Sequence, residues 1–251
     1  MERQHLLSYL DDLLSVRLFK DYAPNGLQVE GAEEVTRVMT GVTASQALID
    51  EAISWGADLL LVHHGYFWKN ESPTITGMKA KRIKSLLAHD INLAGYHLPL
   101  DAHPGLGNNA QLARLLDIEV HSGLDDELGR ALVLKGKLPV AMNAVDFCAF
   151  IEAKLGRAPL HLPGGPSRIE TVAWCTGGAQ DYLDLAADAG VDAFISGEVS
   201  ERTTHIAAER GIHYFAAGHH ATERGGIKAL GEHLADHFNL DVRFVDVPNP
   251  V

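Results

Sequence analysis

The strongest constraint on the fold is an alternation of strand-like and helix-like segments along the first hundred residues. Short runs rich in apolar and β-branched residues occupy 37–42, 57–64 and 91–100, and segments with helical spacing at 45–56 and 79–90 separate them. A chain with this alternation favours a parallel sheet, because each helix carries the chain back to the start of the next strand. We therefore expect an α/β protein with mostly parallel strands.

The composition limits what such a chain can do. The 251 residues are 46% hydrophobic, which can cover the core of one large domain or two small ones. Lys and Arg number 21 against 33 Asp and Glu, a net charge of −12. This is the opposite of the basic surface typical of nucleic-acid-binding proteins, so we expect no strong binding to nucleic acids.

The sequence favours a cytoplasmic protein with no membrane segment. No apolar run approaches the roughly 18 residues that a membrane-spanning helix needs. The N-terminal segment 1–14 has the spacing of an amphipathic helix rather than of a signal peptide. Cys148 and Cys175, the two cysteines, each stand in an apolar stretch, which indicates reduced thiols in the core rather than a disulfide framework.

A faint internal repeat indicates two similar halves. Residues 45–65 align with residues 179–199, and the alignment matches Gly56 with Gly190 and Asp58 with Asp192. Both segments have the pattern of a helix, a C-capping glycine and a buried strand. A true duplication and the general pattern of α/β proteins explain this equally well. The polar segment 121–131 is the best candidate joint, so we predict α/β domains at 1–124 and 131–251.

Histidines and carboxylates follow three of the predicted strands. His63 and His64 end the first strand, His97, Asp101 and His103 follow the second, and His219, His220 and Glu223 follow the third. The carboxyl ends of parallel strands meet at one edge of a sheet, which is where α/β proteins bind ligands. Imidazole nitrogen and carboxylate oxygen together suit zinc, iron and manganese. A single histidine is more often an ordinary hydrogen-bonded residue, but this grouping favours a metal site.

The spacing of these residues helps to choose among them. His219 and Glu223 stand four residues apart and share a helix face, whereas His220 is turned away by about 100°. His63 and His64 point in opposite directions on an extended strand, so two ions that share them are more natural than one.

Two glycine motifs do not support a nucleotide site. Gly105–Ala110 fits the pattern of a dinucleotide-binding loop, but a loop with His103 and Pro104 precedes it instead of a strand. We interpret Asn108 or Asn109 as a helix N-cap. Thr176-Gly177-Gly178 is interpreted as a tight turn between a strand and the helix predicted at 179–190, rather than as a phosphate loop.

Six segments together resemble the Nif-three-like family, whose members are also called dinuclear metal-centre proteins or GTP cyclohydrolase I type 2. They are DYAPNGLQVEG, GVTAS, LLVHHGYFW, HLPLDAHPGLGNNAQLA, ISGEVSE and AGHHATERGG, which lie between residues 21 and 226. The resemblance implies two intertwined α/β domains, assembly as a toroidal homohexamer, and two divalent metal ions per subunit. It also implies the ligands: His63, His64, Asp101, His219 and Glu223.

Two classes of function are consistent with this site. The first is a metal-dependent hydrolase of the cyclohydrolase or phosphoesterase type, acting on a small molecule such as a nucleotide. The second is a non-enzymatic metal-binding scaffold or adaptor. In a hydrolase, His97 is a candidate general acid or base, because an unperturbed imidazole has a pKa near 6.5. His97 could instead support a ligand carboxylate by a hydrogen bond.

Overall fold

The computed structural model describes residues 1–127 and 129–251, which divide into two units. Unit 1 contains Met1–Leu100 and Gly226–Pro248, and unit 2 contains Asp101–Gly225 and Asn249–Val251. The chain leaves unit 1 within helix α4 (Leu98–Ala102) and re-enters it within helix α9 (His219–Phe238). Residue 128, which belongs to the predicted joint 121–131, lies outside the described residues; the segment connects β5 to β6 in unit 2.

Unit 1 is built on a five-stranded sheet in the order β1-β4-β3-β2-β11. β2, β3, β4 and β11 are parallel, and β1 pairs antiparallel with β4. The last strand therefore comes from the far end of the chain. The elements are α1 (Arg3–Leu13), η1 (Val16–Leu18), β1 (Gly26–Val29), β2 (Arg37–Thr43), α2 (Gln46–Trp55), β3 (Leu59–His64), α3 (Gly77–Ala88), β4 (Asn92–Gly95) and β11 (Asp241–Phe244).

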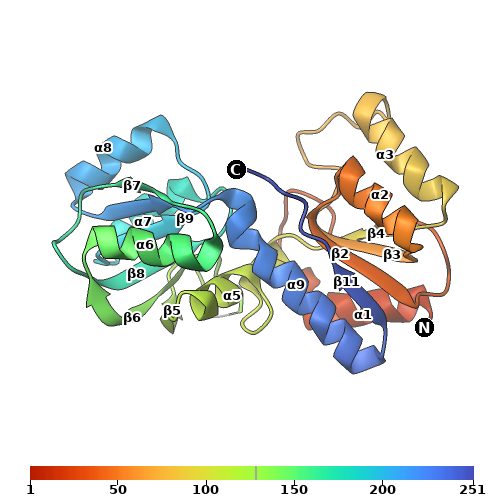
Figure 1. The fold of residues 1–251 in the computed structure, drawn as a ribbon, viewed down its shortest axis with the longest axis horizontal. Helices are drawn as coiled ribbons and strands as arrows, with labels where there is room; N and C mark the ends of the chain where they lie inside the picture. The colour runs from red at the N-terminus through yellow and green to blue at the C-terminus, as the bar shows by residue number, and fades with distance from the viewer. Residues whose placement is uncertain (128) are drawn as a thin grey trace. The chain divides into compact units, whose positions relative to one another are not determined.

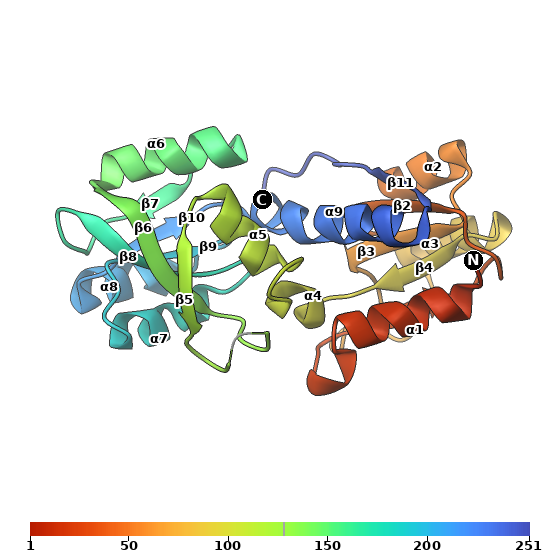
Figure 2. The ribbon, with the colours of Figure 1, turned by 90° about the horizontal axis from the view of Figure 1, so that it is seen from below.

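Helices cover both faces of this sheet, which explains the unbroken apolar run of β3. Residues 59–62 are all buried, as expected of a central parallel strand with no solvent-facing side. Figures 1 and 2 show α2 and α3 on one face, and α1 with the C-terminal part of α9 on the other. The same arrangement leaves His63 and His64 at the carboxyl end of the strand, where no further strand residue follows.

Unit 2 is built on a six-stranded sheet in the order β5-β6-β8-β9-β10-β7. β8, β9 and β10 are parallel, and β5, β6 and β7 pair antiparallel. The elements are α5 (Asn108–Leu115), β5 (Glu119–Gly123), β6 (Leu134–Met142), α6 (Ala144–Leu155), β7 (Leu160–Leu162), β8 (Ile169–Cys175), η2 (Gln180–Tyr182), α7 (Leu183–Asp188), β9 (Ala193–Ser196), α8 (Glu201–Arg210) and β10 (His213–Ala216). The fold is thus mixed α/β with mostly parallel strands, as predicted.

Alternate residues of the central strands of unit 2 pack into two separate hydrophobic cores, one on each face of the sheet. Trp174 and Ile195 pack with α5 and α6 on one face, whereas Cys175 and Phe194 pack with α7 and α8 on the other. This alternation follows from the twofold period of a strand. Both cysteines are free; Cys175 is buried and Cys148 is partly buried, and burial raises the pKa of both thiols.

The residues matched by the internal repeat have the same local roles in both units. Gly56 and Gly190 adopt the left-handed conformation, with φ of 71° and 69°. Asp58 accepts hydrogen bonds from the backbone N–H groups of Thr36 and Arg37, and Asp192 accepts them from Glu170 and Thr171. Each aspartate therefore ties the start of its strand to the neighbouring parallel strand.

Within the described residues, no helix combines the length and the apolar character needed to cross a membrane.

Candidate metal centre

Three histidines of unit 1 form one group at the carboxyl ends of β3 and β4. One ring nitrogen from each of His63, His64 and His97 lies within 4.8 Å of the others. β3 and β4 are parallel neighbours, so the residues that follow them emerge at the same edge of the sheet. His63 is buried, and the other two are half-buried. The sequence prediction that separate strands bring these histidines together is correct for this group.

Hydrogen bonds to the Nδ1 atoms orient His63 and His64. His63 Nδ1 lies 2.9 Å from the carbonyl oxygen of Tyr96, which can only accept, so the ring donates its Nδ1–H and its Nε2 carries the lone pair. His64 Nδ1 lies 3.3 Å from the hydroxyl of Thr43. Metal-binding histidines commonly use their second ring nitrogen in this way.

His97 is held by the segment that follows η1. Its Nδ1 lies 2.7 Å from Asp21 Oδ1, and its backbone N–H donates to the side-chain oxygen of Asn25. The Asp21 carboxylate also accepts from the backbone N–H groups of Tyr22 and Leu98. Burial would raise the pKa of Asp21, but the hydrogen bond and charge of His97, with the other donors, lower it to about 2.

Replacing Asp21 by Asn should destabilise the metal-free protein at neutral pH. A pKa lowered from 3.8 to about 2 corresponds to about 2 kcal/mol of stability. This contribution is present above pH 3.8 and is lost as the pH falls through about 2, because the carboxylate is then protonated in the folded protein as well. Urea unfolding at pH 7 should show the loss in Asp21→Asn and not in Asp12→Asn, an exposed control on α1. Equal stability of the two variants would contradict the role of Asp21.

A histidine and two carboxylates of unit 2 form a second group of candidate metal ligands. His219 and Glu223 begin α9, and Glu223 Oε2 lies 3.1 Å from His219 Nε2. His219 Nδ1 lies 2.7 Å from Glu198 Oε1. Burial would lower the pKa of His219, but hydrogen bonds and charges from Glu223 and Glu198 raise it to about 9. Asp101 is buried, like Glu223, and both carboxylates contribute to the raised pKa of Cys175.

The turn after β8 packs directly against these groups. Thr176 donates its hydroxyl to Asp101 Oδ1 at 3.3 Å, and Gly177 donates its N–H to the hydroxyl of Thr222. Gly177 has a φ of 69°, and a Cβ atom placed there would lie 2.1 Å from Glu223 Oε1 and 3.1 Å from His219 Nε2. The tight turn predicted from the sequence is present, and its glycine leaves the space that the Glu223 carboxylate occupies.

The predicted role of two asparagines as a helix cap is wrong. Gly107 is the N-cap of α5, and neither asparagine caps it with its side chain. Asn108 donates to Asp101 Oδ1 at 2.8 Å, and Asn109 donates to the carbonyl oxygen of Leu132. Both asparagines are buried, so their amides satisfy neighbouring buried acceptors instead of the helix end. Asn108 thus holds the carboxylate of Asp101 in place.

Four other histidines of the sequence have structural contacts. His103 Nδ1 lies 2.9 Å from the backbone nitrogen of Leu106 and 3.2 Å from that of Gly105, so it stabilises the turn before α5. His161 and His213 lie 3.0 Å apart through their ring nitrogens. His233 Nε2 lies 2.5 Å from the hydroxyl of Tyr9. The prediction that the isolated histidines are ordinary hydrogen-bonded residues is confirmed for His161, His213 and His233.

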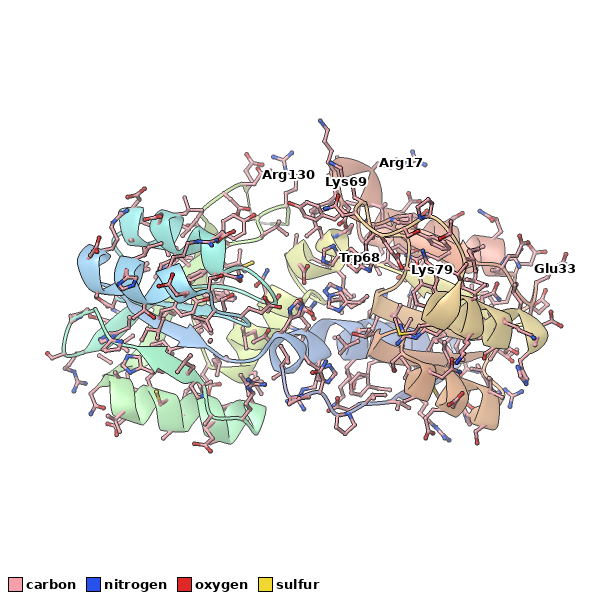
Figure 3. The ribbon with its side chains drawn as sticks, turned by 90° about the horizontal axis from the view of Figure 1, so that it is seen from above. Arg17, Glu33, Trp68, Lys69, Lys79 and Arg130 are labelled. Atoms are coloured by element: carbon pink, nitrogen blue, oxygen red, sulfur yellow. The ribbon has the colours of Figure 1, made fainter. Side chains whose placement is uncertain are left out.

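Trp68 is a residue of the site that the sequence reasoning missed. Its ring centroid lies 4.9 Å from that of His97 and 5.8 Å from that of His64. It stands on the loop after β3, next to Lys69, whose side chain points outward (Figure 3). Trp68 and Asp21 lie in segments that carry the family resemblance, but helix and strand periodicity give no role to either of them.

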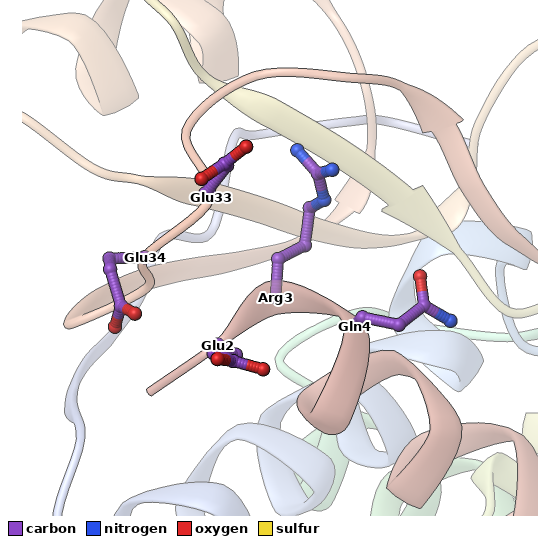
Figure 4. A pocket seen from close by; sticks show the side chains of 5 residues that line it. All are labelled: Glu2, Arg3, Gln4, Glu33 and Glu34. Atoms are coloured by element: carbon purple, nitrogen blue, oxygen red, sulfur yellow. The ribbon is translucent and has the colours of Figure 1, made fainter.

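A pocket of about 310 Å³ occurs elsewhere in unit 1 (Figure 4). It is lined by Glu2, Arg3, Gln4, Glu33 and Glu34. Arg3 is the basic residue among them, and it pairs with Glu30 and donates to the carbonyl oxygen of Gly31. The pocket contains none of the predicted site residues, so it adds nothing to the candidate centre.

The donor atoms of both units fit a divalent transition metal. The structure brings histidine and carboxylate side chains into groups that could hold such an ion. His63 engages Nδ1 with a carbonyl oxygen, and its second nitrogen suits a metal ion. His219 contacts Glu198 through Nδ1 and Glu223 through Nε2, so an ion bound at Nε2 would replace the second of these contacts. The space at Gly177 and the hydrogen bonds to Asp101 likewise hold carboxylates that suit the same ions.

Comparison with known proteins finds similarity along the whole chain. A family model described as Duf34/NIF3 (NGG1p interacting factor 3) matches residues 1–250. A GTP cyclohydrolase 1 type 2 homolog of Escherichia coli (strain K12) is 57% identical over 251 residues, which is 100% of both chains. The solved structure of the protein ybgI, described as of unknown function, has 56% identity and a TM-score of 0.97 over 100% of both chains. A protein from Thermus thermophilus has 36% identity and a TM-score of 0.90, again over 100% of both chains.

Proposed function

Because the chain belongs to the DUF34/NIF3 family, we propose that it is a hydrolase that depends on two divalent metal ions and acts on a nucleotide or a related small molecule. The proposal assigns the metal ligands to His63, His64, Asp101, His219 and Glu223, and the metals to zinc, iron or manganese. It also includes assembly as a homohexamer. The relatives named GTP cyclohydrolase 1 type 2 homolog make a cyclohydrolase-type reaction on a purine nucleotide the first activity to test.

One observation carries the proposal: imidazoles and buried carboxylates are each held by other residues of the chain. His63 is fixed by a backbone carbonyl oxygen, His219 by Glu198, and Asp101 by Asn108. Orientation of this kind reduces the cost of arranging ligands when a metal binds. Divalent ions at such a site lower the pKa of water toward 7 and polarise the bond to be broken. Five protein ligands for two ions leave coordination positions for water and substrate, which suits catalysis better than a structural role.

His97 has the contacts expected of a residue that moves protons. The carboxylate of Asp21 accepts from its Nδ1–H, so a neutral His97 ring presents the lone pair of Nε2. That nitrogen can accept a proton from the attacking water and return it to the leaving group. The pairing of imidazole with a buried carboxylate stabilises the protonated ring during this exchange.

The decisive experiment compares metal-free and metal-loaded protein on one panel of substrates. Protein treated with a chelator, and the same protein reloaded with zinc, manganese or iron(II), would be assayed with nucleoside triphosphates, including GTP, and with phosphomonoesters. We expect turnover that chelation abolishes and metal restores. His97→Gln should lower kcat by about 100-fold or more with its metal content unchanged. If no substrate is turned over in any metal form, the hydrolase proposal fails and a metal-binding scaffold remains.

A further inference from the structure

The indole of Trp68 presents an apolar face beside the histidines of unit 1. Its ring stands edge-on to His97, at 86°, and is tilted at 59° to His64. Its N–H donates to the carbonyl oxygen of Gly65 at 3.2 Å. The residue is half-buried, so it is not enclosed on all sides. With its donor already used, Trp68 can offer a ligand only its aromatic surface and its shape.

The loop that carries Trp68 is held by an internal network. Phe67 has a φ of 65°, a left-handed conformation that is costly for a bulky side chain. The Glu71 carboxylate accepts hydrogen bonds from the backbone nitrogens of Phe67 and Trp68, at 2.8 Å and 3.2 Å. Lys79 of α3 is buried and pairs with Glu71 at 3.2 Å, with its ammonium 5.0 Å from the centre of the Phe67 ring. The surrounding contacts therefore impose a conformation that the backbone alone disfavours.

Two further hydrogen bonds join this loop to the segment that holds His97. Lys69 donates its backbone N–H to the carbonyl oxygen of Tyr22, and Tyr66 donates its own to the side chain of Gln28. Strained backbone maintained by many contacts is characteristic of sites that hold a side chain ready for a ligand. If Trp68 only shielded the histidines from solvent, any apolar residue would serve at this position. The network instead holds the loop so that its flat ring has a fixed orientation.

We propose that Trp68 is a substrate-binding residue that stacks on a planar aromatic ring of the substrate, such as a nucleobase. The inference rests on the proposed function in taking the bound molecule to be the substrate of the metal centre. Stacking between an aromatic side chain and a base contributes enough to change affinity about tenfold or more, and it tolerates different bases because every base has a π face. Trp68 thus favours substrates with an aromatic group over simple phosphates.

Binding measurements on zinc-loaded protein test this proposal without relying on turnover. Calorimetric titrations would compare GTP with inorganic triphosphate for wild type, Trp68→Phe and Trp68→Leu. We expect GTP affinity to fall about tenfold in Trp68→Leu and by less than about threefold in Trp68→Phe, which keeps an aromatic face. Triphosphate affinity and metal content should stay unchanged in both. GTP should quench tryptophan fluorescence in wild type and in the control Trp55→Phe, but far less in Trp68→Phe.

The outcomes separate this inference from the proposed hydrolase. Wild-type protein that binds GTP through Trp68 but turns over no substrate of the panel would support stacking on this residue and contradict the hydrolase. Turnover of GTP with equal GTP affinity in Trp68→Leu would contradict the inference alone. An equal loss of GTP and triphosphate affinity in Trp68→Leu, or no GTP binding by the wild type, would also overturn it.

Discussion

Glu223→Gln should lose most of its bound metal while the protein remains folded. Glutamine has nearly the same shape as glutamate, but it lacks the negative charge and has only one oxygen for an ion. Changes in residues that merely support a ligand already cost about 10- to 100-fold in metal affinity, so loss of a ligand should exceed that range. Metal analysis of purified protein should give about two equivalents per chain for wild type, as the proposed pair of ions requires, and well below one for Glu223→Gln.

Glu232→Gln is the matched control for this measurement. Glu232 lies on the same helix, is mostly exposed, and pairs with Lys228 at 3.9 Å. It should therefore keep the metal content of wild type. His219 gives a second readout, because its pKa of about 9 depends on Glu223 and Glu198. In metal-free Glu223→Gln that pKa should move down, which NMR titration of the ring can follow. Metal content equal to wild type in Glu223→Gln would remove this residue from the ligand set.

Gly177→Ala should damage both the stability and the metal affinity of the protein. An alanine at a φ of 69° is strained, and its methyl group would lie 2.1 Å from Glu223 Oε1. Relief of that overlap requires movement of a buried carboxylate or of the turn. We expect a loss of about 2 kcal/mol or more in the free energy of unfolding of the metal-free protein. Metal affinity should fall by about 10- to 100-fold, because the Glu223 carboxylate is displaced.

The adjacent glycine supplies the control. A Cβ atom at Gly178 would lie 3.5 Å from the Glu198 carboxylate, an ordinary contact, and Gly178 does not have a left-handed φ. Gly178→Ala should therefore change stability and metal content little. Urea unfolding and metal titration would compare the stability and the metal affinity of the two variants. Similar behaviour of Gly177→Ala and Gly178→Ala would show that the space at Gly177 is not required.

The pattern of the sequence predicts the strands and the residues that follow them, because both depend on local order. The buried run of β3 and the histidines at its end are consecutive, so a strand of the expected length places His63 and His64 at the sheet edge. The same holds for His219 and Glu223, whose spacing on α9 brings their side chains to 3.1 Å. Periodicity is informative here because one element positions both groups.

Contacts between distant segments are not encoded in that pattern. Asp21 and His97 are far apart in the chain, and nothing in the local sequence pairs them. Asn108 and Asn109 are good helix caps by propensity, but buried acceptors compete for their amides. The helix predicted at 179–190 is divided into η2 and the short α7, after a turn that packs against the candidate ligands of unit 2. For the two asparagines, tertiary hydrogen bonds outweigh the local preference.

The position of β11 has a consequence for how this protein is made. Asp241–Phe244 pairs with the start of β2, and the carbonyl oxygen of Thr40 accepts from Val245. Until residues 241–244 have been synthesised, this edge of β2 has no partner and the sheet of unit 1 is incomplete. The nascent chain therefore exposes the unpaired edge of β2, which can pair with other strands, throughout the synthesis of unit 2. The first sheet is therefore completed only after unit 2 has been synthesised, and chaperones that shield the edge of β2 would act before then.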